Sequence, residues 1–176
     1  MWKVGGARAA KGGSLDDVIA SAQNVVNRTK SICVGLEPCV IPALGHSNFK
    51  IEDGTMEFGV GHHGEAGTKV EKLKSASEMA QEMAETILND FDFEEGKEVA
   101  VMLSGLGATP VMELYVLYDE VEKVLAKAGH KVWKTYIGNY VTSLDMNGAS
   151  LTIVDLDDEI KELLSEPAVP IGMKNY

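Results

Sequence analysis

The chain has 176 residues and a mass of 18.9 kDa, which suits one domain, or one domain with a short piece of another. Hydrophobic residues make up 45% and charged residues 24%, so the composition excludes a disordered or fibrous protein. The net charge of −11 disfavours nucleic acid as a partner. We find no apolar run long enough for a membrane span and no signal-peptide pattern over residues 1–13, so we expect a cytoplasmic protein that does not bind membranes.

Cysteine usage and charge distribution give two further expectations. Cys33 and Cys39 are too few for a disulfide scaffold, and we expect both to be free, mostly buried thiols. Residues 1–30 hold five basic and two acidic side chains, whereas the rest of the chain is strongly acidic. This shift in charge predicts a boundary near residue 30.

The N-terminal part of the chain predicts one helix and two strands. Ser14, as N-cap, opens an amphipathic helix over residues 14–29. Its apolar stripe consists of Leu15, Val18, Ile19, Ala22, Val25 and Val26. Residues 31–36 indicate a strand, and the prolines after it predict that a loop follows. Residues 55–61 place alternate apolar side chains on one face and indicate a second strand.

The following segments alternate between helix and strand signals. Ser75 to Glu78 has the form of a capping box. Residues 99–103 form an unbroken apolar run, which is typical of a buried strand. Thr109 as N-cap and Pro110 at the first helical position predict a helix that Gly129 ends.

The C-terminal part adds two β-rich segments, residues 131–141 and 149–155, and a short helix over residues 157–164. The clustered acids between Asp155 and Glu166 are typical of a solvated helix face. The alternation along the whole chain predicts an α/β fold, with α+β as the alternative, in which helices pack on a β-sheet.

A glycine-rich segment, residues 59–67, holds the densest group of reactive side chains. It contains His62, His63 and Glu65, and imidazole can act as base, nucleophile or metal ligand. The alternative is a turn whose histidines only face water. Adjacent side chains on an extended segment point to opposite faces, so the two histidines are poorly placed to share a metal ion. Nucleophilic use of one histidine fits better, and we predict no metal site.

Two other segments are candidates for a functional role. Residues 101–110 read as strand, glycine turn and helix start, where free N–H groups could attract phosphate. They lack the P-loop and dinucleotide patterns, so a structural turn is the better interpretation. In the polar segment 138–148, Asp145 could act as acid or base, although a turn contact is more common for aspartate. His46 and His130 are expected on the surface or in loops.

Several motifs in order resemble the substrate-binding (K) subunit of dihydroxyacetone kinases. The family loop Gly-Ile-His-Gly-Glu-Pro-Gly is similar to Gly61–Gly67 here. The other matching segments are Leu36-x-Pro38-Cys39-x-x-Pro42, Glu57–Gly61, Leu106–Pro110 with Glu113-Leu114-Tyr115, and Thr142–Met146. The resemblance covers nearly the whole chain and implies the second domain of the K-subunit fold.

The resemblance implies a specific chemistry for the loop. The family histidine, which corresponds to His63, attacks the carbonyl carbon of dihydroxyacetone and holds the triose as a covalent hemiaminal. Gly61, Gly64 and Glu65 are then expected to line the substrate-binding site. No cofactor is expected on this chain, because ADP or ATP and magnesium sit on a nucleotide-binding partner subunit (L type) or region. A phosphocarrier protein recharges that partner in the bacterial systems, and we expect a homo-oligomer.

The resemblance also implies a division of the chain and a missing part. Residues 1–30 correspond to the terminal helix of a preceding, absent domain, and residues 31–176 to the C-terminal domain of the K subunit. The absent domain, which a separate chain could supply, carries the acid/base groups, so this chain is expected to be inactive alone. The chain departs from the family pattern at His62 for isoleucine, at Ala66 for proline, and at Ser104-Gly105 for an asparagine pair.

Three readings of function follow. In the first, the chain is part of an enzyme, a dihydroxyacetone (glycerone) kinase. In the second, it is a non-catalytic dihydroxyacetone-binding regulator, like the sensor and coactivator paralogues of the family. In the third, it is an inert relic. The sequence leaves open whether the chain is a fragment, a split-gene half or a stand-alone protein, and which phosphoryl donor serves it.

Overall fold

The computed structural model describes residues 1–47, 49–63, 65–91, 93 and 96–173. They divide into two compact units: unit 1 comprises Met1–Thr29 and Val154–Tyr176, and unit 2 comprises Lys30–Ile153. In the part of the chain that is described, no helix combines the length and the apolar character needed to cross a bilayer.

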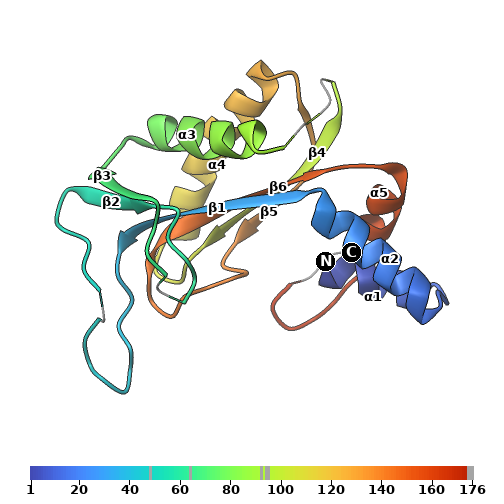
Figure 1. Ribbon diagram of the computed structural model, residues 1–176, viewed down its shortest axis with the longest axis horizontal. Helices are drawn as coiled ribbons and strands as arrows, with labels where there is room; N and C mark the ends of the chain where they lie inside the picture. Colours follow the sequence, from blue (N-terminus) through green and yellow to red (C-terminus); the bar gives the residue numbers. More distant parts are fainter. Residues whose placement is uncertain (48, 64, 92, 94–95, 174–176) are drawn as a thin grey trace. The chain divides into compact units, whose positions relative to one another are not determined.

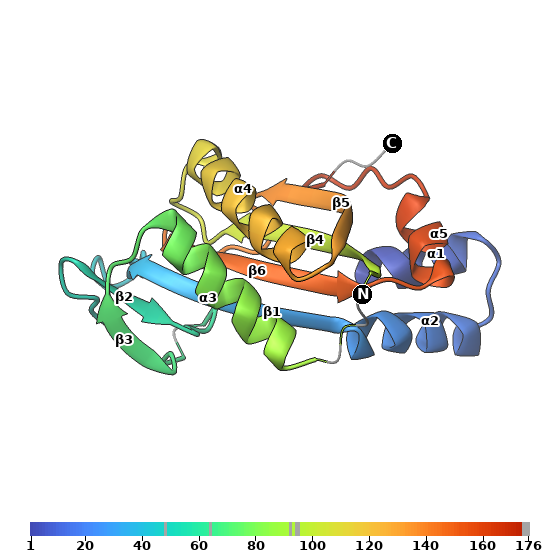
Figure 2. The same ribbon diagram turned by 90° about the horizontal axis from the view of Figure 1, so that it is seen from above.

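Unit 2 is built on a mixed β-sheet (Figures 1 and 2). Its strands are β1 (Thr29–Glu37), β2 (Thr55–Phe58), β3 (Lys69–Lys72), β4 (Glu98–Gly105), β5 (Lys131–Gly138) and β6 (Asn147–Asp155). Their order across the sheet is β3-β2-β1-β6-β4-β5. Strands β4 and β5 are parallel, whereas β2 is antiparallel to both β1 and β3. This sheet, with helices packed on it, confirms the predicted α/β class.

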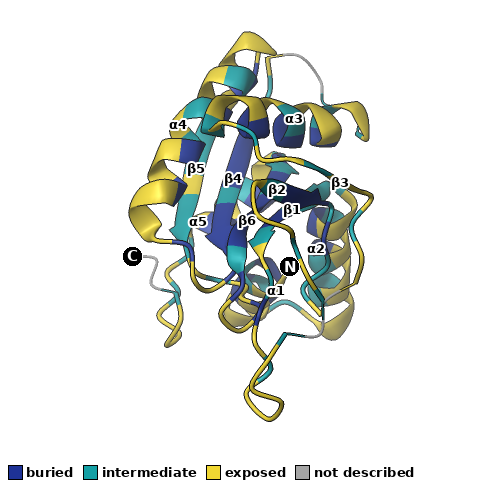
Figure 3. Cartoon of the chain, turned by 90° about the vertical axis from the view of Figure 1, so that its left-hand side faces the viewer, coloured by how far each residue is buried: buried dark blue, intermediate teal, exposed yellow. Residues whose placement is uncertain are grey.

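Two helices, α3 (Ala76–Asn89) and α4 (Val111–Lys127), lie on one face of the sheet (Figure 1). They bury apolar side chains at helical spacing against the strands, as expected for amphipathic helices. The buried helix residues are Met79, Ala80, Met83, Ala84 and Ile87 from α3 and Leu114, Leu117, Val121 and Leu125 from α4. Figure 3 shows this buried layer, with β4 almost wholly buried.

The predicted helix starts are confirmed where a serine precedes an acid by three residues. Ser14 and Ser75 each form a capping box, with Asp17 and Glu78 respectively. The predicted N-cap at Thr109 is wrong. Helix α4 begins one residue later, with Pro110 at the N-cap and no side-chain cap. The Thr109 hydroxyl is buried instead, where it pairs with strand β6.

The strand predicted over residues 55–61 ends earlier than expected. Strand β2 stops at Phe58 because Gly59 has a φ of +79°, outside the extended region. Val60 is buried, as the alternating pattern predicted, but it lies in a loop. The sequence analysis missed β3, a short strand with the composition of a surface segment, which pairs with β2.

Unit 1 consists of three mutually contacting helices, α1 (Trp2–Ala10), α2 (Leu15–Asn27) and α5 (Asp158–Ser165). Residues 1–30, which the resemblance implied to be one terminal helix, form two; local signals did not predict α1, since its glycines and uncapped start give a weak helical signal. The predicted apolar stripe of α2 is only partly buried. Val25 faces inward, whereas Leu15, Ile19 and Val26 are exposed. That residues 1–30 belong to the end of a preceding domain stays a prediction.

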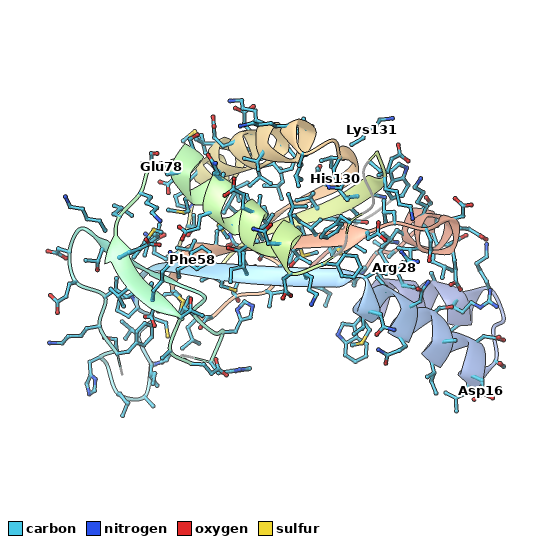
Figure 4. All side chains as sticks on the ribbon, turned by 45° about the horizontal axis from the view of Figure 1, so that its top comes forward. Asp16, Arg28, Phe58, Glu78, His130 and Lys131 are labelled. Carbon is cyan, nitrogen blue, oxygen red and sulfur yellow. The ribbon has the colours of Figure 1, made fainter. Side chains whose placement is uncertain are left out.

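The prediction that the acids between Asp155 and Glu166 form a solvated face is wrong for Asp155, whereas Asp158 and Glu162 are exposed as predicted. Asp155 is buried and forms an ion pair with Arg28, a residue labelled in Figure 4. Lys11 contacts the Glu162 carboxylate at 2.7 Å. Glu159 accepts a 2.6 Å hydrogen bond from the Ser21 hydroxyl. These acids have a polar partner on α2 and basic partners at the C-caps of α1 and α2, which sequence spacing could not reveal.

The remaining single-residue expectations have mixed outcomes. His130, predicted on the surface or in a loop, lies in the loop between α4 and β5. It is only 8% exposed, and its ring stacks edge-to-face on Phe93 with centroids 5.6 Å apart. His46 is exposed, as predicted. Both cysteines are free: Cys39 is buried and Cys33 is half-buried, so burial raises the pKa of the Cys33 thiol.

Candidate functional site

The glycine-rich segment forms the connection between the antiparallel strands β2 and β3. Glu57, the buried penultimate residue of β2, anchors its far end, because one carboxylate oxygen accepts a 2.5 Å hydrogen bond from the Gly67 N–H. The Thr68 N–H donates to the Phe58 carbonyl at 2.8 Å. Figure 4 labels Phe58, the last residue of β2, where the loop leaves the sheet. These hydrogen bonds therefore hold the two ends of the loop together.

Within the loop, Glu65 holds His63 at two points. The carboxylate accepts a 2.9 Å hydrogen bond from the His63 backbone N–H, and its other oxygen lies 3.1 Å from the ring Nδ1. Hydrogen bonds from its own N–H and from the His63 N–H hold the pKa of Glu65 below its usual range. An ionised carboxylate favours the tautomer with the proton on Nδ1. Nε2 is then left with its lone pair.

The His63 ring is presented to solvent, with 90% of its side chain exposed, whereas His62 is half-buried. The His62 Nδ1 atom is buried without a hydrogen-bond partner among the described residues. The two adjacent rings therefore have different environments. The sequence pattern predicted that one ring points into a site while the other packs or faces solvent. His63 is the exposed ring here and His62 the packed one, so a site beside His63 stays a prediction.

Of the two glycines predicted to bind substrate, Gly61 can be placed and Gly64 lies outside the described residues. Gly61 donates its N–H to the Glu65 carbonyl at 2.9 Å. A Cβ added at Gly61 would lie 2.8 Å from both Cβ and Cδ of Glu65. Real Cβ contacts are essentially never that short, so the loop needs glycine at this position to bring Glu65 against His63.

A second loop, residues 139–146, contacts the glycine-rich loop across a wide gap in sequence. The buried Ser143 donates its hydroxyl hydrogen to the His62 carbonyl oxygen at 2.6 Å. Sequence analysis missed Ser143 and Glu57, because their roles depend on tertiary hydrogen bonds. The only available signal was their place inside the family-like segments.

The glycine turn after β4 is structural, as predicted, and two of its N–H groups have protein partners. The N–H groups of Leu106 and Ala108 donate to the carbonyls of Gly148 and Met146, at 3.1 and 3.0 Å. The Thr109 hydroxyl accepts a 2.8 Å hydrogen bond from the Gly148 N–H. These amides are unavailable to a phosphate group.

Asp145 makes a long-range backbone contact in place of the local turn contact that was considered for it. One of its carboxylate oxygens accepts a 2.7 Å hydrogen bond from the Val40 N–H, which ties residues 139–146 to the loop after β1. Among the described residues there is no group of three or more His, Cys, Asp or Glu side chains arranged to hold a metal ion. Glu65 and His63 therefore form a pair without a third ligand.

Comparison with known proteins gives consistent matches. The family model of the Dak1 domain matches residues 1–171. The dihydroxyacetone-binding subunit DhaK of PTS-dependent dihydroxyacetone kinase 1 from Listeria innocua is 41% identical over 159 residues, which cover 90% of this chain and 48% of the relative. This chain therefore spans about half the length of that relative.

Two solved structures are also similar. The dihydroxyacetone kinase operon co-activator Dha-DhaQ has a TM-score of 0.88 at 30% identity, covering 94% of this chain and 51% of that one. The dihydroxyacetone kinase from C. freundii, in complex with AMP-PNP and Mg²⁺, has a TM-score of 0.83 at 27% identity, covering 99% and 31%. With its mixed α/β sheet and its glycine-rich histidine loop, the chain belongs to the Dak1 domain family.

Proposed function

We propose that this chain is part of a dihydroxyacetone-binding kinase subunit, in which His63 holds the triose through a reversible covalent bond. The observation that carries this proposal is the pairing of His63 with Glu65 on a loop shaped by Gly61. Because Glu65 engages Nδ1, Nε2 is the ring atom available to a ligand. Gly61, Gly64 and Glu65 are the proposed lining of the substrate site on this chain.

The covalent step is an addition to the ketone. The Nε2 lone pair attacks the carbonyl carbon, a C–N bond forms, and the π electrons of the C=O bond move to oxygen. The oxygen takes up one proton from solvent, and the Nδ1 proton leaves along its hydrogen bond to the Glu65 carboxylate, which returns it to solvent. The product is a neutral hemiaminal, and the reverse sequence releases the ketone unchanged.

A covalent bond suits this ligand. A three-carbon triose has few atoms, so non-covalent contacts alone give it limited affinity. The bond also orients the terminal hydroxyl for phosphorylation and selects ketones and aldehydes over glycerol, which has no carbonyl group. Dihydroxyacetone and other short ketoses are therefore the proposed substrate class.

The other parts of the reaction are assigned to partners. We place ADP or ATP and magnesium on a nucleotide-binding L-type subunit or region, recharged in PTS-linked systems by a phosphocarrier protein. The structure of a similar kinase with AMP-PNP and Mg²⁺ supports a nucleotide in the assembly. Residues 31–176 are proposed as the C-terminal K-subunit domain, and residues 1–30 as the terminal helical part of the preceding one. Groups that transfer the hydroxyl proton are assigned to that preceding domain, so this chain alone is expected to be inactive.

The test is detection of the adduct with dihydroxyacetone labelled with ¹³C at its carbonyl carbon. We expect the ketone signal to be replaced by that of a tetrahedral carbon in the wild-type protein, and His63→Ala to abolish the change. Glycerol is the control ligand, and a crystal structure with bound ketose gives the bonded atom directly. An adduct that survives in His63→Ala would refute the assignment.

A second candidate is a non-catalytic regulator that binds the same triose. The likeness to an operon co-activator, at a TM-score of 0.88, favours it. Both candidates share the adduct, so phosphorylation separates them. Dihydroxyacetone phosphate formed in a mixture with a nucleotide-bearing L-type subunit, a phosphocarrier protein and the rest of the K subunit supports the kinase; adduct formation without turnover supports the regulator.

A further inference from the structure

We propose that Ser143 is a positioning residue, which sets the direction of the His63 ring by holding the peptide group between His62 and His63. This inference rests on the proposed function, because it concerns the same histidine. The Ser143 hydroxyl bonds the backbone carbonyl of His62, not the His63 ring. Its hydroxyl acts on the backbone that carries the ring.

The peptide group that joins His62 to His63 is held at both ends. Its carbonyl oxygen accepts the 2.6 Å hydrogen bond from Ser143, and its N–H donates at 2.9 Å to the Glu65 carboxylate. Hydrogen bonds on the two sides of one amide polarise each other, and the one to a carboxylate is charge-assisted. Together they fix the plane of this peptide, and therefore the direction in which the His63 side chain leaves the backbone.

Ser143 itself lies on a rigid support. It is only 7% exposed, its N–H donates to the Leu106 carbonyl at 2.7 Å, and its carbonyl accepts from the Met146 N–H at 3.0 Å. The next residue, Leu144, has a φ of +52°, an uncommon conformation for a residue with a side chain. Its carbonyl packs against Gly107 so closely that no Cβ would fit there.

The support extends into the core of the sheet. Ser104 near the end of β4 is fully buried, and its hydroxyl accepts hydrogen bonds from the N–H groups of Tyr140 and Val141, at 2.9 and 3.0 Å. Residues 139–146 are therefore fastened to β4 on one side, and they hold the glycine-rich loop on the other. That loop contains Ala66, which does not restrict φ as proline does, so it depends more on this external support.

The size of the effect follows from one neutral hydrogen bond, whose net contribution of about 0.5–1.5 kcal/mol corresponds to roughly two- to tenfold in an equilibrium. We expect Ser143→Ala to weaken adduct formation with ¹³C-labelled dihydroxyacetone by about three- to tenfold. In the protein without ligand, hydrogen exchange of the amides in residues 59–68 should speed up by a similar factor. Thr142→Ala, at an exposed neighbouring hydroxyl, is the matched control and should change neither quantity.

Two more variants distinguish the loss of this hydrogen bond from a general loss of structure. Ser143→Cys keeps the side-chain volume but offers a weak donor, so it should resemble Ser143→Ala. Ser143→Thr keeps the hydroxyl, so the amides of residues 59–68 should exchange as slowly as in the wild type. A urea unfolding curve for each variant separates local loosening from global destabilisation.

The outcomes are distinguishable. Unchanged exchange of residues 59–68 in both Ser143→Ala and Ser143→Cys overturns the positioning role, whatever the ligand. If the amides of residues 59–68 exchange faster but the adduct forms to the same extent, the contact does not serve the chemistry. This result also overturns the positioning role. If His63→Ala keeps the adduct, the proposed function fails, while the exchange measurement still reports whether Ser143 holds the loop.

Discussion

Replacing Gly61 by alanine tests whether the contact between Glu65 and His63 is necessary. The added Cβ would lie 2.8 Å from both Cβ and Cδ of Glu65, whereas carbon atoms in contact prefer about 3.5–4.0 Å. Glu65 must therefore move by roughly 0.7 Å or more, and because its own Cβ is involved, a change of side-chain rotamer is not enough. The 3.1 Å contact to the His63 Nδ1 is then lost or distorted.

A misplacement of about 1 Å near a reacting group costs on the order of 100-fold in rate. We expect Gly61→Ala to slow formation of the ¹³C-detected adduct by about 10- to 100-fold, while thermal unfolding changes little because the loop is largely exposed. Gly6→Ala is the matched control: no heavy atom lies within 4 Å of its added Cβ, and in the middle of helix α1 alanine is favoured. Adduct formation at the wild-type rate in Gly61→Ala would refute the reasoning.

Three further predictions concern the surroundings of the site. His62→Ile should leave dihydroxyacetone binding nearly unchanged in a titration, since Ser143 uses the backbone carbonyl of residue 62; a large loss would make the His62 ring a participant. Ser104→Ala should lower the free energy of unfolding in urea by about 1–3 kcal/mol, because the N–H groups of residues 140 and 141 lose their acceptor, and an unchanged midpoint would contradict this. Since the pKa of Glu65 is lowered in the folded protein, the stabilisation from its contacts is fully present above its ordinary pKa and is lost as pH falls through the lowered value. The protection of the loop amides, measured as exchange relative to the intrinsic rate at each pH, should fall in that window for the wild type but not for Glu65→Gln.

Local sequence signals predicted most elements of the fold correctly. The capping boxes at Ser14 and Ser75 and the apolar run at residues 99–103 act within a few residues, so their effect is visible without the fold. Errors arose where a partner was distant in sequence. Thr109 resembles an N-cap residue, yet its hydroxyl pairs with Gly148 in β6. His130 lies in a loop as predicted, but its packing on Phe93 leaves no local signal in the sequence.

The same distinction holds for the acids between Asp155 and Glu166. Their spacing is that of an exposed helix face, and only the folded chain brings Lys11 and Arg28 to them. An electrostatic pair between residues more than a hundred positions apart leaves no periodic pattern in the sequence. Burial of the carboxylate of Asp155 is tolerated because its guanidinium partner accompanies it.

The amino-acid sequence by itself determined the helix starts at Ser14 and Ser75 and the buried strand at residues 99–103, because capping and periodicity are properties of neighbouring residues. The choice of His63 rests on the resemblance to the family and is a proposal. The tertiary structure alone decided what holds that histidine: Glu57 at the base of the loop, Ser143 beneath its peptide group, and the turn after β4 that supports Ser143. The physical reason is that a hydrogen bond requires its two atoms within about 3 Å, and only the packed sheet brings together groups as far apart in the chain as residues 62 and 143.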